Sequence, residues 1–213
     1  MENYLFDFDG TLADSGKTAV VATKKAFLDL GLAAPEKEAI LGYMGIPIES
    51  SFVLLGAKDL PKADLNELFE RFRAHYQANE NEYVTLFPGV KDVLAQLVSA
   101  KKQLFVVSSK HSEALARNLE FLGIAKYITD LVGSDNVKNY KPAPDGIELL
   151  VKRHTLTKTQ SVMIGDAIYD IEMGQNAQVK TAGALWGAHD PKAVTALSPT
   201  FALKDPKQLL TLP

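Results

Sequence analysis

Short apolar segments alternate with longer amphipathic segments through the second half of the chain, and this alternation limits the fold most strongly. The apolar segments are Leu104–Val107, Ile128–Val132, Val162–Ile164, Val179–Ala182 and a weaker Thr200–Leu203. The amphipathic segments between them are Val90–Lys101, Ser112–Leu122, Pro144–His154 and Ile168–Ala177. Such an order is typical of consecutive strand–helix–strand units, whose helices cover both faces of a parallel sheet. With Tyr4–Phe8 as a further strand, the sequence predicts an α/β fold with a mostly parallel, Rossmann-like sheet.

Residues 15–86 follow a different pattern, because they lack β-branched apolar segments and carry apolar residues at helical spacing. The expected helices are Thr18–Leu30, a short one from Pro35, Ile48–Leu55 and Lys62–Gln77. Gly31 is a suitable residue to end the first of them. We therefore predict an all-helical insert, residues 15–86, within an α/β core formed by residues 1–14 and 87–213.

Composition excludes several classes of protein. The chain of 213 residues has a net charge of −3, which offers no electrostatic footprint for nucleic acid. It contains no cysteine, so disulfides, thiolate metal sites and a cysteine nucleophile are excluded. No apolar segment approaches the roughly 18 residues that a membrane span needs, and Met1 leads almost directly into the first strand. We expect a cytoplasmic protein, a monomer or homodimer, with no nucleic-acid or membrane partner.

The first apolar segment ends in two carboxylates, Asp7 and Asp9, which are followed by Gly10 and Thr11. Residues i and i+2 of a strand point to the same side, so both carboxylates can face one site. Two negatively charged side chains that face one site repel each other. A fold tolerates them when a cation lies between them or when one of them carries a proton. Both conditions fit metal-assisted phosphoryl chemistry.

Further polar residues follow later apolar segments. Ser108 and Ser109 come after one of them, and Asp166 after another, with Asp170 four residues further on. Lys141 precedes a proline, which favours an extended backbone, and we expect it too at a strand end. Each of these features alone is more often an ordinary turn or surface residue. Together they predict one site at the carboxyl ends of the strands, where open α/β sheets bind ligands.

In this order, Asp-x-Asp-Gly-Thr-Leu, a strand-terminal Ser, Lys-Pro and Gly-Asp-x-x-x-Asp resemble the haloacid dehalogenase superfamily of phosphotransferases. The resemblance covers essentially the whole chain, and the place of the insert matches the helical cap of that family. The segment from Lys180 to Gly187 is similar to the phosphoglycolate phosphatase-like branch. The resemblance implies a Mg²⁺-dependent phosphatase that hydrolyses a small phosphomonoester, phosphoglycolate-like, through an aspartyl-phosphate.

The resemblance also implies a role for each motif residue. Asp7 is expected to be the nucleophile and Asp9 the general acid and base. The Mg²⁺ ligands would be the Asp7 side chain, the Asp9 carbonyl and the Asp166 side chain, with Asp170 orienting a water molecule of the metal. An acid at position 9 favours phosphoryl transfer over dehalogenation, because a halide leaving group needs no proton.

The phosphate oxygens are expected to contact the Ser108 hydroxyl, the Lys141 ammonium and the main-chain amides of Gly10 and Ser109. The insert supplies a candidate specificity loop, which contains Tyr43, Met44, Gly45 and Ile46. Since no Lys or Arg occurs from 42 to 57, a bisphosphorylated sugar, as used by a phosphomutase, is disfavoured.

Other interpretations stay open at this point. The same machinery could act on pyrophosphate, a nucleotide or a sugar phosphate. A different class is a non-catalytic binding or regulatory protein on this scaffold, although the motif aspartates and Lys141 are all present. Several basic residues are more simply explained by the surface or a helix start than by the site: Arg71, Arg73, His75, Lys17, Lys110 and His111.

Overall fold

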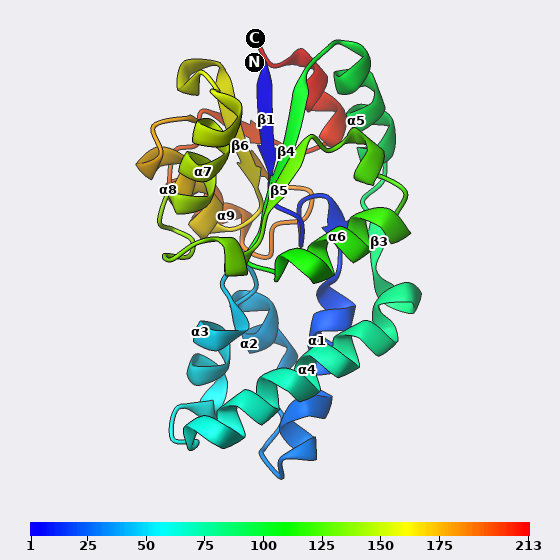
Figure 1. Ribbon diagram of the computed structural model, residues 1–213, viewed down its shortest axis with the longest axis vertical. Helices are drawn as coiled ribbons and strands as arrows, with labels where there is room; N and C mark the ends of the chain where they lie inside the picture. The colour runs from blue at the N-terminus through cyan, green and yellow to red at the C-terminus, as the bar shows by residue number, and fades with distance from the viewer.

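The computed structural model describes residues 1–213, and its sheet lies at one end of an elongated molecule (Figure 1). The six strands are all parallel, in the order β5-β4-β1-β6-β7-β8. Their bounds are β1 Asn3–Phe6, β4 Gln103–Val107, β5 Asp130–Val132, β6 Ser161–Gly165, β7 Lys180–Ala184 and β8 Phe201–Leu203. The predicted α/β fold with a parallel sheet is confirmed.

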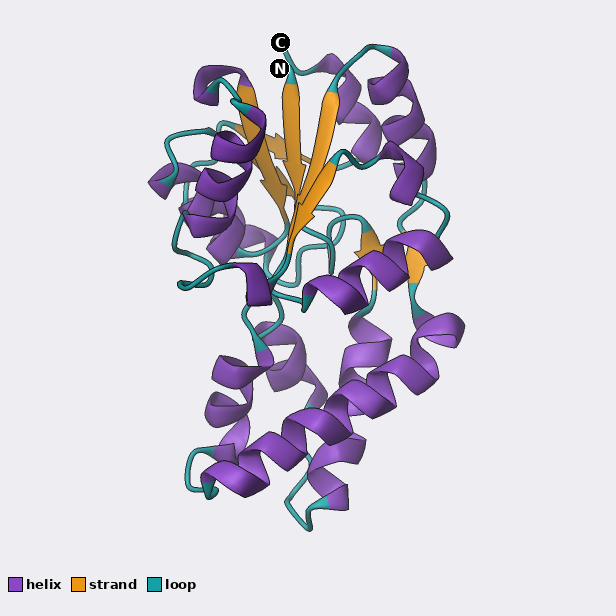
Figure 2. Ribbon diagram, in the orientation of Figure 1, coloured by secondary structure: helices purple, strands orange, loops and turns teal.

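Alternating side chains of each strand enter separate cores on the two faces of the sheet. Tyr4 and Phe6 of β1 belong to a larger cluster with residues of α5 (Val90–Ser99), α6 (Ser112–Phe121) and the short helix η5 (Pro206–Thr211). Leu5 belongs to a second cluster with residues of α7 (Asp145–His154) and α8 (Ile168–Asn176). Helices therefore cover both faces (Figure 2). The remaining helices at this end of the molecule are α9 (Pro191–Ala196), η2 (Ala125–Tyr127), η3 (Ser134–Asn136) and η4 (Lys158–Gln160).

The other end of the molecule is a helical insertion with a core of its own. It contains α1 (Gly16–Asp29), α2 (Lys37–Gly42), α3 (Ile48–Phe52), η1 (Val53–Ala57) and α4 (Lys62–Tyr83). A separate apolar cluster forms around Phe27, Phe52, Leu68 and Phe69, so the aromatic residues pack inside the insertion. None of the helices of the molecule combines the length and the hydrophobicity needed to cross a membrane.

The chain leaves and re-enters the core through a small antiparallel pair, β2 (Ala13–Asp14) and β3 (Thr85–Leu86). The sequence did not predict this pair, because two residues are too few to show an alternating pattern.

Helix α4 is longer than expected. It was predicted to end at Gln77 but continues to Tyr83. The polar residues there suggested a loop, yet Glu80 is buried one turn after the buried Tyr76. Polar contacts rather than apolar ones therefore fix the last turns of this helix.

Candidate active site

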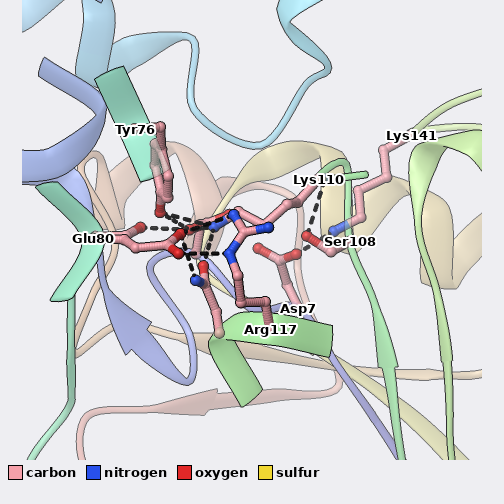
Figure 3. A network of polar contacts seen from close by, with 10 residues as sticks. Asp7, Tyr76, Glu80, Ser108, Lys110, Arg117 and Lys141 are labelled. Carbon is pink, nitrogen blue, oxygen red and sulfur yellow. Dashed lines mark hydrogen bonds and ion pairs between the residues drawn. The ribbon is translucent and has the colours of Figure 1, made fainter. Parts of the chain in front are cut away.

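Strand register brings the motif residues to one edge of the sheet, facing the insertion. Phe6 pairs with Val106 on one side and Ile164 on the other. The residues that follow these strands, including Asp7 and Ser108, therefore emerge close together (Figure 3). Lys141 reaches the same place from the loop between η3 and α7. Its expected position at a strand end was wrong.

The Lys141 ammonium lies between two carboxylates. Its Nζ donates to Asp7 Oδ1 at 2.6 Å and to Asp170 Oδ1 at 2.7 Å. The three side chains are at most 3% exposed. A buried pair of this kind needs further hydrogen bonds to offset desolvation. Asp170 has one, because its Oδ2 accepts from the Ala167 amide at 3.0 Å.

Burial and crowding make the acidic groups hard to ionise. Burial, opposed by Lys141 and reinforced by Asp170, raises the pKa of Asp7 to about 7. Loss of solvation, with Asp170 and Asp7 nearby, also raises the pKa of Asp166. Burial alone would lower the pKa of Lys141, but Asp170 and Asp7 outweigh it and raise that pKa. The site therefore holds more negative charge than Lys141 can balance.

A divalent cation fits this charge and these ligands. Asp7, Asp166 and Asp170 offer carboxylate oxygens within 4.8 Å of one another. Three carboxylates with one ammonium leave two negative charges. Both oxygens of Asp170 have protein donors, whereas Asp7 and Asp166 each keep one oxygen without a donor. An all-oxygen site of this kind suits Mg²⁺. The Asp9 carboxylate is not part of the cluster, which leaves its carbonyl as the expected ligand.

The loop after Asp9 is shaped around Asp166. Gly10 has a φ of +87°, and a Cβ there would lie 2.2 Å from Asp166 Oδ2. Thr11 Oγ1 donates to Asp166 Oδ1 at 2.8 Å. Trp186, from the segment after β7, donates its Nε1 hydrogen to the Thr11 carbonyl at 2.9 Å. This turn thus places Asp166 directly beside the Asp7–Asp9 loop.

Asp9 faces the insertion and is held through one oxygen. Its Oδ1 accepts from Ser15 Oγ at 2.6 Å, Lys110 Nζ at 3.0 Å and the Tyr76 hydroxyl at 3.4 Å. The expectation that Lys110 is a surface residue was wrong, since its side chain is only 10% exposed. Burial alone would lower the pKa of Lys110, but Asp9 and Tyr76 raise it. Burial raises the pKa of Tyr76 to about 12, so its hydroxyl keeps its proton.

A cavity of about 460 Å³ lies between the core and the insertion. Asp7, Asp9, Ser108 and Ser109 line its core side, and the loop residues Tyr43, Met44, Gly45 and Ile46 all line the opposite side. Apolar side chains of the insertion complete the wall: Ile40, Ile48, Phe52, Leu55 and Phe72. The Ser109 hydroxyl donates to the Gly45 carbonyl at 2.7 Å. The structure therefore brings the candidate specificity loop to the motif residues.

Most of the other basic residues lie on the surface, as the sequence suggested, but Arg73 and His111 also line the cavity. Arg71 and Arg73 are exposed and pair with Glu67 and Glu49. Lys17 is exposed, and His75 pairs with Asp29. His111 is exposed and caps the start of α6, where its ring accepts from the Glu113 amide at 3.4 Å.

Sequence reasoning missed the polar residues that join the insertion to the core: Ser15, Tyr76, Glu80, Lys110, Arg117 and Asn118. One signal was present for Glu80. The apolar spacing of Phe69, Phe72 and Tyr76 extends by one turn to this residue, which places it on the buried face of α4.

Comparison with known proteins agrees with this geometry. The family model described as haloacid dehalogenase-like hydrolase matches residues 4–184. The chain is 31% identical to a phosphoglycolate phosphatase of Vibrio parahaemolyticus, over 96% of this chain and 92% of that protein. It is 30% identical to the pyrophosphatase PpaX of Oceanobacillus iheyensis, over 98% and 94%.

Among solved structures, a haloacid dehalogenase-like family hydrolase from Streptococcus pneumoniae superimposes with a TM-score of 0.85. It is 26% identical to this chain, and the match covers 99% of this chain and 97% of the other. The chain therefore belongs to the haloacid dehalogenase-like hydrolases, as its motifs indicated.

Proposed function

We propose that this protein is a Mg²⁺-dependent phosphatase that hydrolyses a small phosphorylated metabolite through an aspartyl-phosphate on Asp7. The observation that carries this proposal is the buried contact of Lys141 with Asp7, beside an acidic cluster with two free carboxylate oxygens. We also propose that residues 15–86 act as a cap over the cavity.

In the proposed reaction, a carboxylate oxygen of Asp7 attacks phosphorus and the bond to the ester oxygen breaks. Ser108 and Lys141 hold the non-bridging oxygens and offset their developing charge. Mg²⁺, when bound by Asp7, the Asp9 carbonyl and Asp166, would reduce the repulsion between the phosphate and these carboxylates. Asp9 would protonate the leaving oxygen and then take a proton from the water that hydrolyses the aspartyl-phosphate.

The charges of the cavity support a substrate with a single phosphoryl group. Each cation that lines it already has an acidic partner: Lys110 contacts Asp9, Arg117 contacts Glu80 and Arg73 contacts Glu49. A second phosphoryl group would meet no unpaired arginine or lysine there. We therefore propose a phosphomonoester, and the name of the Vibrio relative makes phosphoglycolate the first candidate. Pyrophosphate, named for the Oceanobacillus relative, is the second candidate.

Phosphate release from a panel of compounds tests the proposal. The panel contains phosphoglycolate, pyrophosphate, a hexose bisphosphate and p-nitrophenyl phosphate, each with Mg²⁺ and with EDTA. We expect Mg²⁺-dependent turnover, with phosphoglycolate above pyrophosphate and the bisphosphate. Turnover of pyrophosphate alone would replace the substrate but keep the chemistry. No turnover of any compound would favour a non-catalytic binding protein.

A further inference from the structure

Lys110 is enclosed by acceptors from three parts of the chain. Its ammonium contacts Asp9 Oδ1 at 3.0 Å, the Tyr76 hydroxyl at 2.8 Å and Asn118 Oδ1 at 3.0 Å. An ammonium has three hydrogens, so these contacts use all of them. The charge also lies 4.8 Å from the Phe8 ring centroid and 4.3 Å from that of Tyr76. Lys110 thus has no hydrogen left for a substrate in this arrangement.

Helix α4 of the insertion reaches this lysine by two routes. Tyr76 contacts Lys110 directly (Figure 3). Glu80, one turn further along the same face, accepts from Asn118 Nδ2 at 2.8 Å. The Asn118 amide is therefore shared, because its oxygen accepts from Lys110 while its nitrogen donates to Glu80.

Arg117 holds Glu80 in place. Its Nε and Nη2 nitrogens donate to the two Glu80 oxygens at 2.6 and 3.1 Å (Figure 3). The Glu80 side chain is only 4% exposed, so a change in the position of α4 would leave a buried charge without partners, which is costly. The contacts of Lys110 therefore depend on how the insertion packs against α6.

The two oxygens of Asp9 are treated differently. All the protein donors, from Ser15, Tyr76 and Lys110, contact Oδ1. No protein donor reaches Oδ2. This atom is not buried, because Thr18 Oγ1 is the only buried side-chain polar atom that lacks a hydrogen-bond partner. Asp9 lines the cavity, so Oδ2 is the oxygen left open for proton transfer.

We propose that Lys110 is a positioning residue, which fixes Asp9 Oδ1 so that Oδ2 can exchange a proton with the leaving oxygen. Tyr76 and Glu80 make this positioning depend on the seated insertion. The inference rests on the proposed function, because it assumes that Asp9 transfers a proton. In the first step the proton moves from Oδ2 to the ester oxygen as the P–O bond breaks. In the second step Oδ2 takes a proton from the attacking water.

The test compares esters with good and poor leaving groups. Protonation of the leaving oxygen accelerates the cleavage of phosphoglycolate, whose alkoxide is a poor leaving group. It has little effect on the cleavage of p-nitrophenyl phosphate. In the Lys110→Met variant we expect kcat/KM for phosphoglycolate to fall about 100-fold, within the range of general acid catalysis, and kcat/KM for p-nitrophenyl phosphate to stay within about threefold. Lys17→Met is the matched control, because this exposed lysine does not contact Asp9.

A double-mutant cycle shows whether Lys110 acts through Asp9. Asp9→Asn and Asp9→Asn/Lys110→Met should have equal activity on phosphoglycolate. Two results would overturn the positioning role. One is an equal loss of activity on both esters in Lys110→Met. The other is a loss on adding Lys110→Met to Asp9→Asn that is as large as the loss it causes in the wild-type background.

A second variant provides the test in case Lys110→Met does not fold. Tyr76→Phe keeps the buried ring and Lys110 but removes one hydroxyl. We expect kcat/KM for phosphoglycolate to fall more than kcat/KM for p-nitrophenyl phosphate, as in Lys110→Met, but by a smaller factor. The opposite preference, or none, would overturn the inference. A wild-type protein inactive on both esters and on pyrophosphate would overturn the proposed function itself, and the positioning role with it.

Discussion

The hydroxyl of Ser109, on the core, donates to the main-chain carbonyl of Gly45, on the helical insertion, across 2.7 Å. Gly45 has a φ of +100°, and a Cβ there would lie 3.1 Å from the Ala167 side chain at the start of α8. The loop that faces the motif residues is thus fixed to the core by a hydrogen bond on one side and by close packing on the other.

Removal of this hydrogen bond should weaken substrate binding. A hydrogen bond contributes about 0.5–1.5 kcal/mol, so we expect Ser109→Ala to raise KM about 2- to 10-fold while kcat changes less. Steady-state kinetics on the preferred ester would measure this change. Ser99→Ala is the control, since Ser99 donates to the Ala95 carbonyl within its own helix. Unchanged KM in Ser109→Ala would mean that the loop is held by packing alone.

The Asp7→Asn variant should lose the nucleophile and keep the fold. An amide cannot form the aspartyl-phosphate, so we expect turnover to fall at least about 1,000-fold, the order of loss seen when a nucleophile is removed. Circular dichroism and phosphate release would be measured on the same preparation. Activity above a few per cent of wild type, with contamination excluded, would contradict the covalent mechanism.

Metal binding should become more stabilising as the pH rises. In the metal-free protein the pKa of Asp7 lies near 7 against a usual 3.8, so the folded state binds more protons than the unfolded state between these values. Stability from this group is therefore present at low pH and is lost as the pH rises towards 7. Mg²⁺ needs the deprotonated carboxylate and removes this penalty.

Thermal melts at pH 5 and pH 8, with and without Mg²⁺, would measure the effect. We expect a larger increase of Tm with Mg²⁺ at pH 8 than at pH 5, and a smaller difference between the two pH values in Asp7→Asn. Equal increases of Tm with Mg²⁺ at both pH values in the wild type would contradict this prediction.

Variants of two glycines would distinguish backbone strain from a clash with the acidic cluster. Gly10 and Gly31 both have positive φ, but only a Cβ at Gly10 meets another group, Asp166. Alanine in this backbone region costs about 1–2 kcal/mol. We expect Gly31→Ala to lower Tm without changing Mg²⁺ affinity or activity, and Gly10→Ala to reduce all three. Calorimetric Mg²⁺ titration would measure the difference, and equal affinity in the two variants would show that Asp166 adapts.

The sequence indicated the α/β fold and the cluster of motif residues for one physical reason. Asp7, Ser108 and Asp166 each follow an apolar segment, and parallel strands in register bring such positions to one edge. Local patterns were sufficient there because the sheet geometry is general. Lys141 reached the same edge from a loop, so its place depended on the motif resemblance and not on the strand pattern.

The contacts between core and insertion could not be read in the same way. Lys110 resembles any surface lysine in the sequence, and its burial depends on Tyr76 and Asn118, which come from different helices. Glu80 stands in a polar segment that suggested a loop. Partners far apart in the chain decide these positions, and a single sequence carries no direct signal of such pairing.

The place of β1 in the sheet has a consequence for synthesis of the chain. This first strand ends at Phe6, but its neighbours are β4, which begins at Gln103, and β6, which begins at Ser161. At about 5–20 residues per second on the ribosome, β1 waits many seconds for either partner. The helices of the insertion emerge earlier and pack mainly on one another. The nascent chain can therefore complete the helical insertion before the strand that leads to Asp7 has any neighbour.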